Sequence, residues 1–455
     1  MAPEEKIVVE KDGETRFAEI GPLVDAYFDS GAPVQKINEV TEQVPLPPGE
    51  LNALAFGSDL KYGSAPVTSV IRHAGQSMYE IKTRKGRKVK VTGQHSVFTL
   101  DENCAVKQVK VSELKLNSGD FIVVPKKLVL SQTANEINFF EKMVRAPAKW
   151  YAVLPREYAA ELLNEAGARE WLRSRRKTPW NTLAYAARRS GVLPLQLFAD
   201  LSVMPPHSVL EKTTLFRRTT KNTHSFNAVV KLDRDFGFAI GALAAEGWLG
   251  KSFQFTCTDF SYFTKFVAAA EKSLGTKVLC LEQNRTGRKR KYVAVLGEAV
   301  ATALKKEGFG GRSGDKQLPS IMLCAPEECV CGVLEGFTLG DGSKYLNRNK
   351  ADYNVRLYTN SPLLAEQLNF LLLRLGILAR LSEDDKTKSN PRWRKNNVIT
   401  ISGAENLETF LSGIMREPCS IRLANSGFET IPFAASAIKN QLRQLGVSLK
   451  QACID

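Results

Sequence analysis

The sequence predicts an α+β protein made of an all-β N-terminal module, a basic helical region and a duplicated C-terminal half. Short alternating apolar and polar runs, separated by Gly, Pro and Asp, dominate residues 1–130. Residues 131–229 change to helical spacing with dense positive charge, and residues 230–425 carry a pattern of helices and strands that occurs twice. Residues 426–455 are expected to form a helical segment that stops inside its second helix.

Composition limits the cores and the kind of partner. A chain of 455 residues with 43% hydrophobic residues can form two or three cores. The net charge of +15 favours a polyanionic partner, because Lys and Arg displace counterions from phosphate, but it does not separate DNA from RNA or an acidic membrane. No apolar run reaches bilayer length and the eight scattered cysteines are typical of reduced thiols, so a soluble, cytoplasmic protein is expected.

Four runs in the N-terminal module alternate as strands with one buried face do. They are residues 6–10, 77–81, 88–92 and 120–124.

Residues 181–202, within the basic region, are predicted to form a helix, a tight turn at Gly191 and Pro194, and a second helix. The arrangement is similar to a helix-turn-helix DNA reader, while an ordinary helical hairpin on a basic face explains it equally well. In the first case Arg188 and Arg189 are candidate DNA contacts.

The strongest pattern is the duplication. Residues 239–247 (AIGALAAEG) and 334–342 (LEGFTLGDG) each place small residues three and four apart, then an acid, then a glycine that ends the predicted helix. Strands, a helix (about 262–274 and 362–375) and further strands follow each copy. Each unit is therefore predicted to contain helix, strands, helix and strands.

The acids of the two copies are Glu246 and Asp341. Gly241 and Gly336 predict that the two helices pack almost in contact, which places the carboxylates side by side. Such a pair repels unless cations lie between the carboxylates, and hard oxygen ligands prefer Mg²⁺ or Mn²⁺, which can activate water for phosphodiester hydrolysis. Simple helix caps are the alternative, but an acid at a helix C-terminus opposes the macrodipole.

The two motifs resemble the signature of the LAGLIDADG homing endonucleases, closely at 334–342 and more loosely at 239–247. Residues 358–377 (YTNSPLLAEQLNFLLLRLGI) are also similar to that family. The resemblance covers residues 230–425. It implies a pseudo-two-fold monomer whose paired ββαββ saddles bind a long, asymmetric site on double-stranded DNA and cut each strand with Mg²⁺. The metal-binding positions that it implies are Glu246, Gly247, Asp341 and Gly342, with both acids catalytic.

Basic residues near the metals steady the transition state in that family. Position in the repeat makes Lys291 and Lys395 the candidates, with Lys289 next, although plain phosphate contacts explain each lysine at least as well. Glu246 replaces the commoner Asp, which is expected to slow cleavage of one strand. Further DNA contacts are expected from the base-rich turns, at Arg285, Arg288, Lys289, Arg290, Arg392 and Arg394.

The N-terminal module resembles a second family. Residues 88–100 (KVKVTGQHSVFTL) and 112–125 (SELKLNSGDFIVVP) are similar to two blocks of inteins, the self-splicing Hint fold. The resemblance covers about residues 1–130 and implies that Thr92 and His95 polarise the peptide bond at the N-terminal junction.

Two departures predict that the chain as given does not splice. Met1 or Ala2 stands where an intein begins with Cys or Ser, and residues 451–455 (QACID) lack the terminal His-Asn. The closing Hint strands are also expected to be missing, which leaves the module incomplete. Three explanations stay open: a chain trimmed at both ends, a gene fragment, and a nuclease that has lost its splicing half.

Cys324, Cys329 and Cys331 have CxxxxC and CxC spacing, and no His follows them. Small buried hydrophobes are therefore favoured over a zinc site.

The predicted function is that of an intein-derived, site-specific DNA endonuclease. Two alternatives stay open: a maturase-like protein that binds DNA on the same saddle without cutting it, and a protein that acts principally in splicing. Paired carboxylates argue against the binder, because they repel phosphate.

Overall fold

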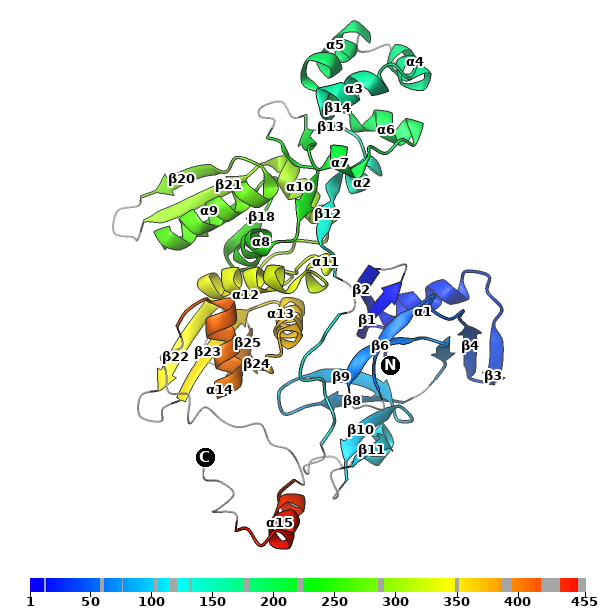
Figure 1. The fold of residues 1–455 in the computed structure, drawn as a ribbon, viewed down its shortest axis with the longest axis vertical. Helices are drawn as coiled ribbons and strands as arrows, with labels where there is room; N and C mark the ends of the chain where they lie inside the picture. The colour runs from blue at the N-terminus through cyan, green and yellow to red at the C-terminus, as the bar shows by residue number, and fades with distance from the viewer. Residues whose placement is uncertain are drawn as a thin grey trace.

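The computed structural model describes residues 1–11, 14–57, 61–75, 77–101, 105–114, 121–130, 133–174, 180–218, 224–284, 290–347, 352–385, 395–418 and 434–448. A β-rich module, a helical region and two α/β units follow one another along the chain (Figure 1). The α+β class predicted from the sequence is confirmed. Within these ranges, no helix combines the length and apolar character needed to cross a bilayer.

The N-terminal module consists mostly of antiparallel strands, as the alternating runs predict. Its elements are β1 (Lys6–Lys11), β2 (Glu14–Glu19), α1 (Ile20–Phe28), β3 (Gln35–Asn38), β4 (Thr41–Pro45), β5 (Asn52–Phe56), β6 (Tyr62–Pro66), β7 (Ser69–His73), β8 (Met78–Lys82), β9 (Lys88–Thr92), β10 (Ser96–Leu100), β11 (Val106–Lys110) and η1 (Val111–Glu113). The sheets have the strand orders β2-β1-β5-β6, β3-β4-β7, β8-β9 and β10-β11. Val9, Val44 and Val70 meet Tyr27 of α1 in a small separate core.

The strand predicted at 120–124 is wrong for residues 121–124, the part that the structure describes. The backbone N–H of Val123 donates to the carbonyl of Phe98 (2.7 Å), but residues 121–124 do not form a strand. Alternation alone does not form a strand, because the backbone also needs a partner along its whole length.

The helical region is built around a four-stranded sheet of order β14-β13-β15-β16. Its elements are β12 (Glu136–Asn138), α2 (Phe139–Val144), β13 (Trp150–Val153), α3 (Arg156–Leu162), α4 (Ala166–Ser174), α5 (Trp180–Ser190), β14 (Val192–Pro194), α6 (Leu195–Leu201), α7 (His207–Leu210), β15 (Thr214–Arg217), β16 (Phe226–Asn227) and β17 (Val229–Lys231). Pairing of β12 with β17 brings the two ends of this region together. An ion pair between Lys142 of α2 and Glu307 (2.5 Å) joins the region to the first α/β unit.

The turn expected between the helices of 181–202 is a short strand, β14, which pairs with β13. The second helix, α6, buries Leu195, Leu197 and Phe198. Its exposed Asp200 accepts hydrogen bonds from the side chains of Gln196 and Trp171. This helix buries its apolar side chains and contains no Lys or Arg, and the helix-turn-helix and helical-hairpin interpretations of residues 181–202 both stay predictions.

The two α/β units have the same topology. The first contains α8 (Arg234–Glu246), β18 (Gly247–Leu249), β19 (Phe253–Cys257), α9 (Phe260–Leu274), β20 (Leu279–Gln283), β21 (Lys291–Leu296) and α10 (Glu298–Lys306). The second contains α11 (Ser320–Leu323), α12 (Glu327–Asp341), β22 (Gly342–Asn347), β23 (Asp352–Thr359), α13 (Pro362–Arg374), β24 (Arg380–Asp384), β25 (Asn396–Ile401), α14 (Ala404–Glu408) and η2 (Thr409–Ile414). The sheet orders β18-β19-β21-β20 and β22-β23-β25-β24 confirm the predicted duplication.

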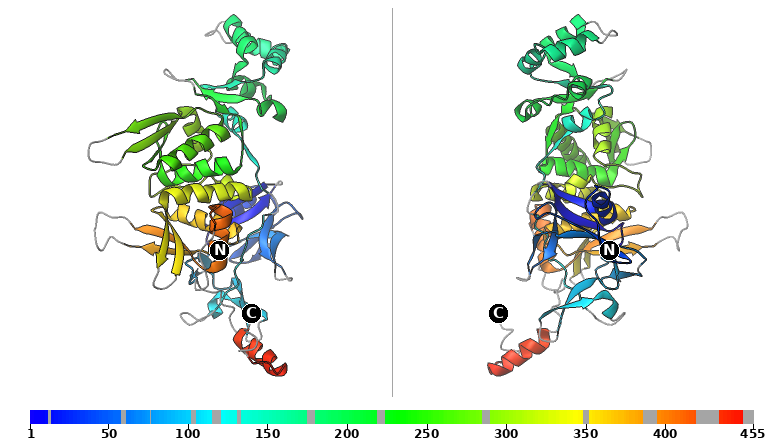
Figure 2. Two further views of the ribbon diagram at one scale, coloured as in Figure 1. Left: turned by 60° about the vertical axis from the view of Figure 1, so that its left-hand side comes forward. Right: turned by 90° about the vertical axis from the view of Figure 1, so that its right-hand side faces the viewer.

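The helices α8 and α12 lie side by side between the two sheets (Figures 1 and 2). One further helix, α15 (Ala434–Gln444), follows the second unit.

The N-terminal module contacts the second α/β unit at an edge of its sheet. The backbone N–H of Leu381, in the edge strand β24, donates to the carbonyl of Lys85 in the β8–β9 turn (2.8 Å). Phe17 of β2 packs against Phe370 of α13, with ring centroids 5.1 Å apart. The backbone groups of one sheet edge are thus partly covered by another part of the chain.

Candidate active site

Glycines spaced four residues apart bring the two signature helices into contact. A Cβ built on Gly241 would lie 2.0 Å from the carbonyl oxygen of Val333, and one on Gly336 would lie 2.2 Å from a carbonyl oxygen of α8. Gly237 and Gly332, just outside the two motifs, approach the partner helix as closely. Any side chain at these positions would push the helices apart. The predicted close packing is confirmed.

This packing brings Glu246 and Asp341, the last residues of α8 and α12, to the same end of the helix pair. A Cβ on Gly340 would lie 3.1 Å from the Cγ of Glu246. Burial, and next the charge of Glu246, raise the pKa of Asp341 to about 6. Burial also raises the pKa of Glu246, although its side chain is exposed. The two carboxylates are thus held together at an electrostatic cost, which a bound cation would relieve.

Gly247 and Gly342 end these helices without the left-handed conformation that glycine often adopts there. Both are extended, with φ of −80° and −104°. Glycine is needed for space, because a Cβ on Gly247 would lie 2.2 Å from the carbonyl oxygen of Leu243, and one on Gly342 would lie 2.4 Å from that of Thr338. Each acid is therefore followed directly by the first strand of its sheet.

Lys316, which motif analysis missed, lies between the two units beside both acids. Its Nζ donates to the carbonyl oxygens of Ala244 (2.9 Å) and Ala245 (2.5 Å) at the end of α8. Burial lowers the pKa of Lys316, and the charges of Asp341 and Glu246 oppose that effect. Lys316 in turn lowers the pKa of both carboxyls. It belongs to a loop outside both copies of the repeat, so only the contact identifies it.

Lys291 and Lys395, predicted to assist catalysis, have different surroundings. Lys291 begins β21, and its charge lowers the pKa of Glu246. Lys395 lies just before β25, and its Nζ is 3.6 Å from a carboxylate oxygen of Asp385. Lys291 thus acts electrostatically on Glu246, whereas Lys395 has a carboxylate partner of its own. The catalytic role of either lysine stays a prediction.

Three of the predicted DNA contacts lie in described parts of the chain. Arg290 pairs with Glu282 (3.0 Å). Arg188 and Arg189 are exposed at the end of α5, where Arg189 donates to the hydroxyl of Tyr185 (2.9 Å). The other predicted contacts lie outside the described residues; they are Arg285, Arg288, Lys289, Arg392 and Arg394.

Thr92 and His95 lie beside the start of the chain. The backbone N–H of His95 donates to the carbonyl of Thr92 (3.0 Å), and the N–H of the buried Ala2 donates to that of Lys90 (2.9 Å). Burial, and next the N-terminal amino group, lower the pKa of His95, so its imidazole is neutral at pH 7. The His95 imidazole therefore lies within electrostatic range of the N-terminal amino group.

The two acids fit a hard divalent cation such as Mg²⁺ or Mn²⁺. Among the residues that the structure describes, no group of three or more His, Cys, Asp or Glu side chains could hold a metal. The protein would contribute Glu246 and Asp341, with the backbone at Gly247 and Gly342 beside them. Mg²⁺ is commonly held in this way, by one or two carboxylates completed by water and substrate phosphate.

The cysteine group behaves as buried apolar side chains. Cys324, Cys329 and Cys331 are all buried, and burial raises the pKa of the Cys324 and Cys331 thiols to about 11. Protonated thiols of this kind are poor metal ligands, in line with the interpretation that the sequence favours.

Residues 328–415 match the family described as LAGLIDADG-like domain. That match covers the second α/β unit, and the first unit repeats its sheet order and packs its helix α8 against α12. The chain is 26% identical over 442 residues to a DNA polymerase of Thermococcus litoralis, an alignment that covers 83% of this chain and 24% of the polymerase. The chain spans about a quarter of the length of this polymerase and of two similar Thermococcus polymerases.

Two solved structures are also similar. A mini-intein of transcription factor IIB is 32% identical, over 27% of this chain and 68% of its own, with a TM-score of 0.25. A homing endonuclease solved with its DNA recognition sequence is 16% identical, over 44% of this chain and 88% of its own, with a TM-score of 0.30. The chain therefore contains a LAGLIDADG-like domain at residues 328–415, and other parts of it are similar to inteins and homing endonucleases.

Proposed function

We propose that this chain is a site-specific endonuclease that cuts double-stranded DNA with Mg²⁺ or Mn²⁺. The observation that carries the proposal is the pair of carboxylates, Glu246 and Asp341, held together at the ends of two touching helices with the half-buried Lys316 beside both. A net charge of +15 supports a polyanionic substrate. Both acids lie in one chain, which favours a monomer.

The residues of the site divide the work as follows. Glu246 and Asp341 would hold the cation. The bound cation would neutralise negative charge on the phosphate and lower the pKa of the water that hydrolyses the phosphodiester bond. Lys316, fixed by the carbonyls of Ala244 and Ala245, keeps a positive charge where the scissile phosphate gains negative charge. Lys291 adds a second cation on the Glu246 side. Each of the two α/β units acts on one strand of the DNA.

The test is cleavage of a supercoiled plasmid library that carries long random inserts, with Mg²⁺, with Mn²⁺ and with EDTA. Wild type is expected to linearise some plasmids, whereas Asp341→Asn and Glu246→Gln leave them supercoiled or nicked. Asp29→Asn, an exposed acid of the N-terminal module, is the matched control and should cut as wild type does. If wild type bound DNA tightly but cut it with neither metal, the endonuclease proposal would be rejected in favour of a protein that binds DNA without cutting it.

The position of His95 favours a second candidate function, activation of the peptide bond that precedes the first residues. The neutral imidazole lies near the N-terminal amino group, where it can donate to or accept from a peptide unit. A reporter fused before an Ala2→Cys chain should be released by added thiol, and His95→Ala should stop the release. A reporter that stays attached would leave the module a scaffold.

A further inference from the structure

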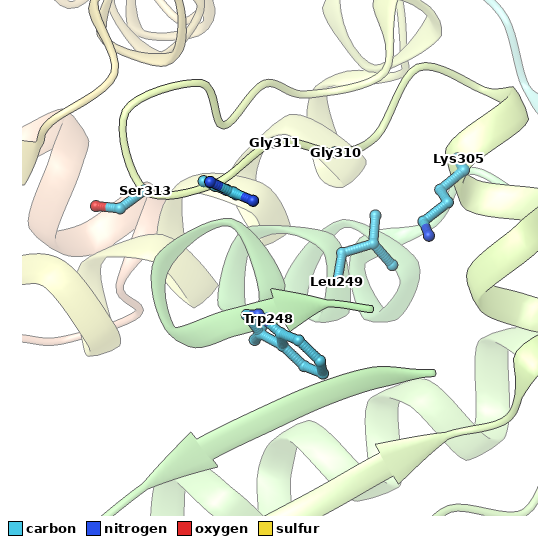
Figure 3. A pocket seen from close by; sticks show the side chains of 7 residues that line it. Trp248, Leu249, Lys305, Gly310, Gly311 and Ser313 are labelled. Carbon is cyan, nitrogen blue, oxygen red and sulfur yellow. The ribbon is translucent and has the colours of Figure 1, made fainter. Parts of the chain in front are cut away.

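A pocket of about 590 Å³ lies beside the first acid, between β18 and the loop that follows α10. Trp248 and Leu249 of β18 form one wall, residues 310–313 form the other, and Lys305 of α10 lies at one end (Figure 3). Trp248 stands two positions after Glu246, so one wall of the pocket begins two residues from the first acid.

The Trp248 side chain is 61% exposed yet held in place. Its ring lies over Gly250, where a Cβ would be only 2.3 Å from the indole Cη2. The Nζ of Lys305 donates to the carbonyl of Gly250 (2.7 Å), which fixes the turn beneath the ring. A large aromatic face is therefore presented to solvent by a rigid support.

The opposite wall is also anchored. The side-chain amide of Asn360 donates to the hydroxyl of Ser313 (3.0 Å), and the hydroxyl of Ser361 donates to the carbonyl of Lys316 (2.7 Å). Both donors come from the second unit, so the wall is fixed to both halves of the protein. Arg312 projects from this loop as an exposed side chain, and no carboxylate among the described residues pairs with it.

The chemistry of the lining selects its occupant. One exposed indole, two cations (Lys305 and Arg312) and no acidic side chain suit a planar ring that carries a phosphate. In the second unit the position two residues after Asp341 is Ser343, which has no ring, so the feature belongs to one unit alone.

We propose that this pocket binds a single unstacked nucleotide of the DNA strand cut at Glu246, with its base on Trp248 and its phosphate on Arg312. The proposal rests on the proposed function, since it assumes that DNA lies on the saddle. Removing one nucleotide from the stack beside the acid pair would position the strand for cleavage. Because the second unit has no such aromatic ring, only one of the two DNA strands would be held in this way.

The test compares two fluorescent mixed-sequence duplexes, one fully paired and one with a single bulged thymidine, binding in Ca²⁺ by anisotropy. Wild type should bind the bulged duplex about tenfold more tightly, the size expected for one base stacked on an aromatic ring. Trp248→Ala should lose the preference while keeping its affinity for the paired duplex. Arg312→Gln should reduce the preference. Tyr345→Ala, an exposed aromatic in the first strand of the other unit, should keep it.

Equal binding of the two duplexes by wild type, or a preference that survives in Trp248→Ala, overturns the pocket assignment. Plasmid cleavage by the same preparation would then leave the proposed endonuclease intact. Failure of wild type to bind or cut any DNA would instead overturn the proposed function and, with it, this inference.

Discussion

The hydroxyl of Tyr262, in the first α/β unit, donates a 2.7 Å hydrogen bond to the backbone carbonyl of Gly336 in the second. Burial, and next the charge of Glu246, raise the pKa of Tyr262, so the hydroxyl stays a donor at neutral pH. A Cβ on Gly340 would lie 3.0 Å from the same oxygen. One buried hydroxyl therefore ties α12, the helix that ends at Asp341, to the opposite unit.

Tyr262→Phe should lower the free energy of unfolding by about 1 kcal/mol, because one buried hydrogen bond is lost without a change in packing. Chemical denaturation monitored by circular dichroism measures the change. The control is Tyr292→Phe, whose ring packs against Phe263 and which makes no hydroxyl hydrogen bond within the described ranges. Equal stability of Tyr262→Phe and wild type would show that this bond does not hold the units together.

Gly241→Ala should destabilise the protein by roughly 3 kcal/mol, because its methyl group would collide with the backbone of Val333 and force the helices apart. Differential scanning calorimetry provides the measurement. Gly413→Ala is the matched control, since a Cβ there meets nothing within 4 Å and its φ is not in the left-handed region. A Gly241→Ala protein as stable as this control would contradict the close contact of the helices.

Lys316→Met should reduce cleavage about 100-fold or more with little change in DNA affinity, because a half-buried positive charge beside both acids is removed. It should also raise the pKa of both carboxyls, since Lys316 is their largest attractive charge. Single-turnover cleavage and anisotropy separate the two effects. Lys306→Met, an exposed cation at the end of α10, should behave as wild type. Loss of binding equal to the loss of cleavage would make Lys316 an ordinary phosphate contact.

Cleavage should rise with pH through about 6, because Asp341 must lose its proton before it can hold a cation. Below that value the rate at low Mg²⁺ should fall about tenfold per pH unit. The inflection should move to lower pH as Mg²⁺ increases, because metal and proton compete for the same oxygens. A pH profile that does not respond to Mg²⁺ would argue against Asp341 as a ligand.

Asp341→Asn should stabilise the metal-free protein at pH 8. The folded-state pKa of about 6 lies above the ordinary value of 3.8, so the folded state binds more protons than the unfolded state between those values. The free energy of unfolding of wild type therefore falls as pH rises through this window. The variant has an uncharged amide at this position, so its free energy of unfolding does not fall for this reason. Its Tm should exceed that of wild type by a few degrees at pH 8, and the gap should close below pH 4. A variant less stable at pH 8 would contradict the repulsion.

Local sequence was enough to predict the duplicated units, the acids and their helix ends. Glycines at four-residue spacing allow only a close helix contact, and the acid that ends each helix is a property of one short segment. The sequence alone therefore predicted a helix contact at Gly241 and Gly336 and a pair of acids at Glu246 and Asp341. The short strands of residues 6–10 and 88–92 were also predictable from local sequence, because alternating residues and flanking turn residues indicate them.

Contacts between distant segments escaped prediction. Lys316 is identified by carbonyls more than 70 positions away, and the pocket at Trp248 needs a loop that comes 60 positions later. The run at 120–124 looked like a strand but lacks a continuous partner. Composition and periodicity report which face of an element is buried, whereas the identity of the neighbour depends on how complete units pack. The raised pKa values of the two acids also depend on this packing, because burial and the distance to neighbouring charges determine them.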